Sequence, residues 1–363
     1  HRTSAIVAEQ LRTWGYAVHT GLAGTGVVGQ LRRGTGRKRL GLRADMDALP
    51  LQESNRFAHA SIHPGVMHAC GHDGHTAILL AAAKHIAAKV DFSGTLNLIF
   101  QPAEEHPGGA KIMMAQGLFD LFPCDAVFAL HNMPGYPAGH LVFREGPAMA
   151  SSDDVRITLT GKGGHGAMPH LANDTVVAAS AMVMALQCIV SRNVDPQQTA
   201  VVTVGALHAG QANNVIPASA SLALSVRSLS NEVRDLLEQR IRAVVTAQAE
   251  SFGVQAEIDY QRDYPVLVNT PVETNLARAV GTALLGPDKV THQGPALTGS
   301  EDFAFMLTQC PGSYLLIGNG NGAGEGACMV HNPGYDFNDS ILPTGAAYWC
   351  ALTHRYLQDE PSP

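Results

Sequence analysis

The stretch from His75 to Phe100 decides the fold, because a long apolar helix pattern directly precedes a buried strand: HTAILLAAAKHIAAKV (75–90) and then TLNLIF (95–100). The first run is Ala-rich, and its apolar residues fall at helical spacing. The second run is short and continuously apolar, which is typical of a strand covered on both faces. Similar strand patterns occur at Leu40 to Ala44 and at Ala126 to Leu130. This alternation predicts an α/β fold with a mixed, mostly parallel sheet covered by helices.

The pattern changes near Ser151, where DDVRITLT alternates polar and apolar residues before a Gly-rich turn. The elements expected next are a helix, two strands, a helix and a strand, at Asp174 to Ile189, Thr199 to Ala206, Ser219 to Ser228, Asn231 to Ala249 and Ala256 to Tyr260. Their order, βαββαβ, matches the ferredoxin-like split unit. We therefore predict one domain made of residues 1–151 and 264–363, with a second domain, 152–263, inserted into it.

The composition limits the classes of function. A chain of 363 residues with 45% hydrophobic content buries a large core, and its net charge of -7 argues against nucleic-acid binding. No apolar stretch approaches the roughly 20 residues of a membrane span. The six cysteines are irregularly spaced, which is not the pattern of a disulfide scaffold. We expect a cytoplasmic protein with no membrane or nucleic-acid partner.

Side chains able to bind metal occur in four separate places. They are Cys70 and His72 in HACGHDGH, Glu105 in QPAEE, His131 in ALHN and His331 in MVHNPG. The first three groups follow apolar runs of strand type, and the ends of parallel strands face a shared crevice. Thiolate, imidazole and carboxylate ligands together suit zinc, cobalt or manganese. Since one ion needs about four ligands, five candidates and a water indicate a pair of ions.

Each of these signals is weak when taken alone. A buried cysteine such as Cys70 is more often a small hydrophobic residue than a ligand. Adjacent glutamates such as Glu104 and Glu105 are common on solvated surfaces. Here, however, Pro102 and the pair Gly108-Gly109 place them in a tight loop after a buried strand, where two charges need a reason. The combination is therefore stronger than its parts.

Six motifs, in order along nearly the whole chain, carry a family resemblance. They are LRADMDALP (42–50), MHACGHDGHTA (67–77), FQPAEE (100–105), GKGGHGAMPH (161–170), NNVIP (213–217) and GSEDFAFM (299–306). The sequence thereby resembles the dinuclear metal amidohydrolases that include hippurate hydrolase, indole-acetyl-amino-acid hydrolases and N-acyl-amino-acid deacylases. These enzymes belong to the wider group of aminoacylase and carboxypeptidase metalloenzymes.

The resemblance implies a role for each matching residue of the first domain. Two divalent ions (Zn, Mn, Co or Ni) would be held by Cys70, His72, Glu105, His131 and His331, with Cys70 shared between them. Glu104 would be the general base. Relatives elsewhere in the group have a His-x-Asp metal motif where this chain has Asp45-Met46-Asp47. That difference argues against Asp45 as a ligand, and Asp47 would orient the ligands instead.

The resemblance also implies roles for the inserted domain, as a lid and a dimerisation domain. His165 would stabilise the oxyanion, and in relatives this histidine reaches the site of the neighbouring subunit, so we expect a homodimer. Arg227, helped by Asn214, would bind the free carboxylate of the substrate. Gly299 to Asp302 would line the acyl pocket, with Glu301 near the metals and contacting substrate.

The activity implied is hydrolysis of the amide bond of N-acyl-amino acids, small molecules of which hippurate is the model. Two alternatives within the same group are a dipeptidase or carboxypeptidase, and a deacetylase of N-acetyl-diaminopimelate. A third alternative is a protein that only binds a metal or acyl-amino acids. The presence of Glu104 beside Glu105 favours turnover, because a binding site needs no second carboxylate next to a ligand.

Overall fold

A computed structural model describes residues 1–358 of the chain, which fall into two compact units. Unit 1 comprises His1–Gly146, Val268–Pro295 and the chain from Asp302 onward, and unit 2 comprises Pro147–Leu267 and Ala296–Glu301. The predicted insertion, 152–263, lies inside unit 2. The segment Ala296–Glu301 was not expected there. The functions of the two units, as a catalytic domain and a lid or dimerisation domain, stay predictions.

Unit 1 is built on an eight-stranded sheet with the order β1-β2-β4-β3-β5-β16-β6-β15. Its strands are β1 (Ala17–Leu22), β2 (Gly26–Arg33), β3 (Arg39–Asp45), β4 (Gly94–Gln101), β5 (Ala126–Pro134), β6 (Leu141–Val142), β15 (Val290–Thr291) and β16 (Gly312–Gly320). The central strands β4, β3, β5 and β16 are parallel, whereas β1 and β2 add an antiparallel edge. The mixed, mostly parallel α/β sheet predicted from the sequence is confirmed.

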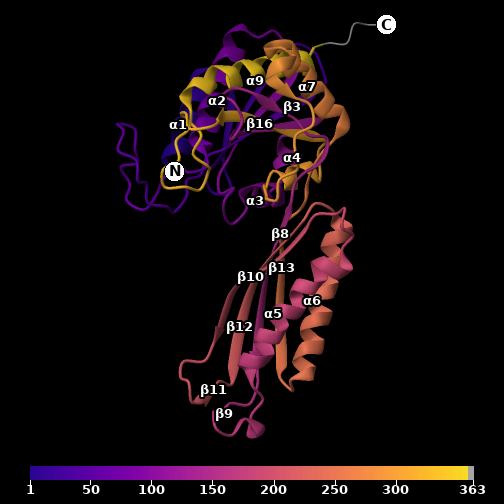
Figure 1. Cartoon of the computed structure of the whole chain (residues 1–363). Coiled ribbons are helices and arrows are strands. Elements are labelled where there is room, and N and C mark those ends of the chain that lie inside the picture. Colours follow the sequence, from indigo (N-terminus) through magenta and orange to yellow (C-terminus); the bar gives the residue numbers. More distant parts are fainter. Residues whose placement is uncertain (359–363) are drawn as a thin grey trace. The chain divides into compact units, whose positions relative to one another are not determined.

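Helices cover this sheet. They are α1 (Arg2–Thr13), α2 (His72–Lys89), α3 (Gly109–Ala115), α4 (Leu118–Leu121), α7 (Pro271–Leu285), α8 (Ala304–Leu307) and α9 (Leu342–Tyr356). Helices α2 and α9 pack against each other and against β3 (Figure 1). Ile78, Leu79 and Ile86 of α2 are fully buried in the same core as Leu42 and Trp349. The Ala-rich stretch 75–90 therefore forms most of helix α2, which is buried in the core of unit 1.

The strand ends place the chemistry of unit 1. Strand β3 ends at Asp45 and its parallel neighbour β4 ends at Gln101, so the residues that follow them emerge at the same edge of the sheet. Helix α2 begins at His72. Strand β5 continues past the predicted end at Leu130, because His131 pairs with Leu316 of β16. His131 is therefore held within a strand and not in a loop after it.

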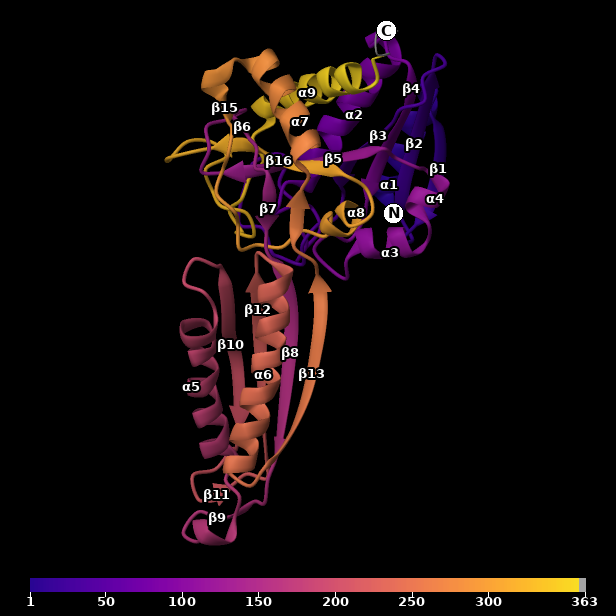
Figure 2. The ribbon, with the colours of Figure 1, turned by 90° about the vertical axis from the view of Figure 1, so that its right-hand side faces the viewer.

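Unit 2 contains a four-stranded antiparallel sheet with the order β10-β12-β8-β13. Its main elements are β8 (Ser151–Thr160), α5 (Thr175–Asn193), β10 (Ala200–Ala209), β12 (Ser219–Ser228), α6 (Asn231–Ser251) and β13 (Gln255–Tyr264). Both helices lie on one face of the sheet (Figure 2). Strand β8 alternates buried and exposed side chains, which matches a sheet covered on one face. The predicted βαββαβ order of elements is confirmed.

Side-chain caps and short elements complete the fold. Asp174 caps α5 by accepting a hydrogen bond from Val176 N at 2.8 Å, and Ser230 caps α6 through Val233 N at 3.1 Å. The short elements are β7 (Gly146–Met149), β9 (Gly164–His165), β11 (Val215–Ile216), β14 (Leu267–Asn269) and three 3₁₀ turns, η1 (Pro169–Leu171), η2 (Pro287–Lys289) and η3 (Asp339–Ile341).

Helix α5 corrects one expectation from the sequence. By length and composition alone it is apolar enough to cross a membrane, although no stretch was expected to approach that length. One such helix is weak support for a membrane span. Ala178, Met182 and Leu186 bury one face of α5 in the core of unit 2, while Val177 and Met184 remain exposed.

Candidate metal centre

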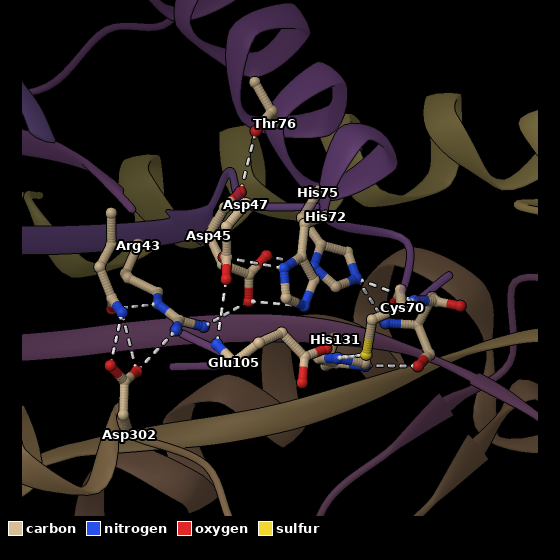
Figure 3. Close-up of polar contacts among 12 residues, drawn as sticks. Arg43, Asp45, Asp47, Cys70, His72, His75, Thr76, Glu105, His131 and Asp302 are labelled. Atoms are coloured by element: carbon tan, nitrogen blue, oxygen red, sulfur yellow. Dashed lines mark hydrogen bonds and ion pairs between the residues drawn. The ribbon is translucent and has the colours of Figure 1, made fainter. Parts of the chain in front are cut away.

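Two groups of side chains converge at the edge of the unit 1 sheet, and they share Glu105. Figure 3 shows Cys70, His72 and Glu105 from these groups. In the first group, ligand atoms of Cys70, Glu105 and His331 all lie within 4.8 Å of one another. In the second, the same limit encloses His72, Glu104 and Glu105. The nitrogen Nε2 of His331 is 2.9 Å from Glu105 Oε1. Donor atoms from three distant stretches of sequence therefore meet around one carboxylate.

His131 adds a further donor beside the first group. Its Nε2 lies 3.4 Å from Cys70 Sγ, and its Nδ1 lies 2.6 Å from the carbonyl oxygen of Asn132. Because a carbonyl only accepts, Nδ1 carries the proton and Nε2 keeps its lone pair toward Cys70. The structure thus brings together all five residues that the resemblance assigned to metal.

The backbone of the turn Cys70-Gly71-His72 is fixed by its contacts with Asn132. Gly71 has a φ of 90°, and a Cβ at this position would lie 2.2 Å from Asn132 Nδ2, so a larger residue does not fit. Asn132 Nδ2 donates to the carbonyl oxygen of Cys70 at 2.6 Å. Tyr335 Oη in turn donates to Asn132 Oδ1 at 2.6 Å. These bonds set the direction of the thiol and of the first residue of α2.

The loops that carry Glu104, Glu105 and His331 have unusual backbone conformations. In the part of the chain that the structure describes, only three non-glycine residues have a positive φ, and two of them are Ala103 (56°) and His331 (62°). Such conformations cost about 1–3 kcal/mol and gather at functional sites. The backbone N–H of His331 donates to the carbonyl oxygen of Ala69 at 2.6 Å, which places this loop beside Cys70.

Asp47 contacts two of the five residues. Its Oδ1 is 3.1 Å from His72 Nδ1, and its Oδ2 accepts from the backbone N–H of Glu105 at 3.0 Å. Since a carboxylate accepts, His72 donates from Nδ1, and Nε2 is the nitrogen left to bind a metal. That Nε2 is buried and has no hydrogen-bond partner. A buried imidazole whose other nitrogen is held by a carboxylate is the usual arrangement of a metal ligand.

The sequence did not indicate the role of Asp45 and His75. The backbone N–H of Asn132 donates to His75 Nε2 at 2.9 Å, so His75 donates from Nδ1 to Asp45 at 2.6 Å. Asp45 also accepts from the fully buried Arg43 at 2.8 Å. Burial opposes its charge, yet His72, Arg43 and His75 hold the pKa of Asp45 well below its usual value. Asp45 is thus already bonded behind the site, consistent with its exclusion as a ligand.

The ionisable groups at the site have strongly shifted pKa values. Burial raises the pKa of the Cys70 thiol, and the carboxylates Glu105 and Glu104 add to this effect. Burial lowers the pKa of His131 to about 4. Burial also works against the charge of His72, but Asp45 and Asp47 raise its pKa to about 9. A divalent cation would offset the negative charge of these carboxylates and bind Nε2 of His72, which has no hydrogen-bond partner. The donor set therefore fits metal.

The remaining predicted residues lie in unit 2. His165 is exposed in β9 and pairs with Val215 of β11, and Gly166 N donates to Asn214 O at 2.8 Å. The motifs around His165 and Asn214 therefore form one turn structure. Arg227 lies elsewhere, at the far end of β12, opposite Ser152. Its Nη1 donates to Ser300 Oγ at 2.8 Å, and burial lowers its pKa.

The separation along β12 limits how the residues of unit 2 can act together. Strand β12 begins at Ser219 beside the His165 turn, so Arg227 is about 26 Å further along it at 3.3 Å per residue. Asn214 and Arg227 of one chain therefore cannot bind the same carboxylate, and their joint role stays a prediction that requires a second chain. One expectation for the junction of the two units is wrong. Asp302, expected to line a pocket, is fully buried in unit 1 and bonds Arg43 and Gln101. Glu301 is the last residue of unit 2, and its contact with substrate stays a prediction.

Comparison with known proteins gives consistent results. The model of peptidase family M20/M25/M40 matches residues 41–355. The chain is 44% identical to the hippurate hydrolase of Campylobacter jejuni, covering 98% of this chain and 91% of the relative. It is 38% identical to the IAA-amino acid hydrolase ILR1-like 5 of Arabidopsis thaliana, covering 99% and 83%. The crystal structure of Bacillus subtilis YXEP, a dinuclear metal binding peptidase of the M20 family, superposes with a TM-score of 0.83 at 29% identity, covering 97% and 91%.

Proposed function

The chain belongs to peptidase family M20/M25/M40 and is a metal-dependent amidohydrolase with two divalent metal ions as cofactors, and we propose that it acts on N-acyl-amino acids. The observation that carries this proposal is the convergence of five donor side chains with Glu104 beside them. The names of the hippurate hydrolase and the IAA-amino acid hydrolase support the substrate class, since both act on an amide between an acyl group and an amino acid.

Five residues would hold the ions: Cys70, His72, Glu105, His131 and His331. When bound, Zn, Mn, Co or Ni ions supply Lewis-acid chemistry, because they make water more acidic and polarise the amide carbonyl. Glu105 is common to both groups of donors, and the sharing of Cys70 between the two ions stays a prediction. Asp47 would fix the orientation of the His72 imidazole and the Glu105 backbone relative to each other, because each of its two oxygens binds one of them.

Glu104 would act as the general base. Its carboxylate is buried and lies within 4.8 Å of both His72 and Glu105 ligand atoms, so it faces the same space. It would accept a proton from the attacking water and return it to the departing amine. Glu105 cannot share this task if its oxygens are bound to metal. The adjacent glutamates would therefore differ in role because the loop directs them to different partners.

The substrate would be bound by residues of unit 2 from two copies of the chain. His165 would donate to the oxyanion, and Arg227 would bind the free carboxylate. Within one chain, Arg227 lies at the end of β12 far from the β9-β11 turn that carries His165, about 26 Å away or more. A single small substrate can contact both only if they come from different chains, which supports a homodimer.

The surface of unit 2 supports the same homodimer. From Thr175 to Ser191, helix α5 carries no charged residue, and its exposed face includes Val177, Met184 and Cys188. Strand β10 beside it is an edge strand of the sheet. An uncharged helix face next to a sheet edge is a surface that monomers usually protect. A cytoplasmic location is proposed as well, supported by six cysteines that are all free.

A hydrolysis panel tests the proposed function. N-benzoyl-glycine, N-acetyl-amino acids, N-acetyl-diaminopimelate and unblocked dipeptides would be offered to the metal-free protein reconstituted with Zn, Mn, Co or Ni. We expect N-acyl-amino acids to be cleaved with the highest kcat/KM. Preferential cleavage of unblocked dipeptides would favour the dipeptidase or carboxypeptidase alternative. Preference for N-acetyl-diaminopimelate would favour the deacetylase.

A further inference from the structure

Asp302 makes contacts that the proposed reaction does not yet use. It is the first residue of unit 1 after the chain leaves unit 2, and it is fully buried. Its Oδ1 lies 3.1 Å from Arg43 Nη2, and both of its oxygens accept from Gln101 Nε2 at 2.8 Å. Its Oδ2 also accepts from the backbone N–H of Ala110 at 2.8 Å. Figure 3 shows the carboxylate facing Arg43.

The two groups that Asp302 binds besides Arg43 flank one loop. Gln101 is the last residue of β4, and Ala110 lies in the first turn of α3. Between them runs the loop PAEEHPG (102–108), which carries Glu104 and Glu105. One buried carboxylate therefore joins the start of this loop to its end.

The loop needs such a closure because its own backbone is strained. Ala103, directly before Glu104, has a φ of 56°. Inside the loop, the N–H of Gly109 donates to Ala103 O at 2.7 Å, and a Cβ on Gly109 would lie 1.7 Å from Pro102 O. A residue in the left-handed region persists only where its surroundings hold it. Asp302, which lies outside the loop, holds its two ends by accepting hydrogen bonds from Gln101 and Ala110.

We propose that Asp302 is a positioning residue that fixes the shape of loop 102–108 and thereby directs Glu104 for proton transfer. The proposal rests on the proposed function of Glu104. A carboxylate oxygen of Asp302 lies within 4.8 Å of a Glu104 ligand atom, so a change at Asp302 acts close to the reacting groups. The side chains of Arg43 and Gln101 and the backbone N–H of Ala110 all donate to Asp302, and a carboxylate can accept from all three.

The competing explanation is that Asp302 only neutralises the buried Arg43. In that case its loss lowers the stability of unit 1 without a specific effect on the loop. Asp125 provides a control for the loss of an Arg–Asp pair in unit 1, because it binds Arg39 at the opposite end of β3, although its side chain is 38% exposed and that of Asp302 is buried. Asp125 accepts hydrogen bonds from the side chain and from the backbone N–H of Arg39. Asp302 likewise accepts from one side chain, that of Arg43, and from one backbone N–H, that of Ala110.

The experiment compares Asp302→Asn with Asp125→Asn in two measurements. Hydrogen exchange of the metal-free protein follows the amides of residues 102–110, and we expect about tenfold faster exchange in Asp302→Asn, as for a lost hydrogen bond to a charged acceptor. In the metal-loaded enzyme we expect kcat to fall about 100-fold, because a small displacement of a reacting group has that effect. KM and the content of two ions per chain should stay near wild type. Asp125→Asn should change neither the loop nor kcat.

A second variant, Gln101→Met, separates positioning from charge and from misfolding. It removes one anchor of the loop and the acceptor of Arg43 Nε, but leaves the Asp302 carboxylate and its pair with Arg43. We expect faster loop exchange and a smaller fall in kcat of about tenfold, since one neutral anchor is lost. The proposal is overturned if loop exchange stays at the wild-type rate in both variants, or if kcat falls no further than in Asp125→Asn. Hydrogen exchange needs no substrate, so it remains decisive even if the wild type cleaves no N-acyl-amino acid.

Discussion

The two units hold their candidate site residues in different ways. In unit 1, Cys70, His72 and His131 are buried and each has a defined hydrogen-bond neighbour, so their directions are set before any ligand binds. In unit 2, His165 and Asn214 are exposed on one short turn. Preorganised groups suit metal binding and proton transfer, whereas exposed groups suit contacts completed by a substrate or a second chain. Substitutions should therefore act differently in the two units.

The largest effect is expected for Glu104→Ala in unit 1. Loss of the general base should lower kcat by about 10²- to 10⁴-fold. Metal content, measured by atomic emission after dialysis, should remain near two ions per chain. Glu105→Ala is the matched variant in the same loop, and it should lose metal as well as activity. Loss of metal in Glu104→Ala, with metal retained in Glu105→Ala, would mean that the two roles are exchanged.

His165→Ala tests the corresponding group of unit 2. Removing one oxyanion donor should lower kcat by about 10²- to 10³-fold. The thermal midpoint should not change, because the side chain is exposed. His170, also exposed and in the nearby turn η1, serves as the control and should keep its activity when changed to Ala. A shift of the thermal midpoint with unchanged kcat would assign His165 to the fold and not to the reaction.

Asp47→Asn tests whether hydrogen bonds that orient the metal-binding residues of unit 1 matter for metal affinity. Asn can accept from only one of the two groups that Asp47 now binds, so His72 and Glu105 lose their common orientation. Loss of such a partner typically weakens metal affinity by about 10- to 100-fold. Titration calorimetry of the metal-free protein with Mn²⁺ would measure it. The exposed Asp120→Asn is the control. An affinity equal to wild type would show that Asp47 does not orient the ligands.

The smallest effect is expected for Arg227→Ala in unit 2. A charge-assisted hydrogen bond to a free carboxylate contributes about 1.5–3 kcal/mol, so KM for N-benzoyl-glycine should rise about 10- to 100-fold. The corresponding amide, N-benzoyl-glycinamide, should be cleaved with an unchanged KM. Arg156, exposed on β8 of the same sheet, is the control. If the wild type cleaves both substrates equally well, Arg227 does not bind the carboxylate.

The sequence predicted the metal-binding edge well, because local signals were sufficient. Apolar runs mark the strands that end at Asp45 and Gln101, Cys70 and His72 lie at the recognisable start of helix α2, and Glu105 lies in the loop after β4. The end of β5 was predicted too early. The polar His131 and Asn132 look like a strand end in sequence, but pairing with β16, far along the chain, keeps them in the strand.

The sequence could not indicate which residues support the metal-binding side chains and the loop that carries Glu104. The contact of Arg43 with Asp302 joins positions 259 residues apart, and no periodicity encodes such a pair. Likewise, the pattern of β12 shows that Arg227 lies in a strand but not how far the His165 turn lies from it. Strand register settles that distance, and register depends on non-local pairing. For this reason the sequence could not show that Asn214 and Arg227 of one chain are too far apart to bind one carboxylate.

The most direct test of the account is anomalous diffraction from crystals of the protein soaked in a zinc or manganese salt. The account predicts two adjacent ions at the edge of the unit 1 sheet, bonded to Cys70, His72, Glu105, His131 and His331. A single ion, or ions that leave Cys70 and His331 unbound, would contradict it.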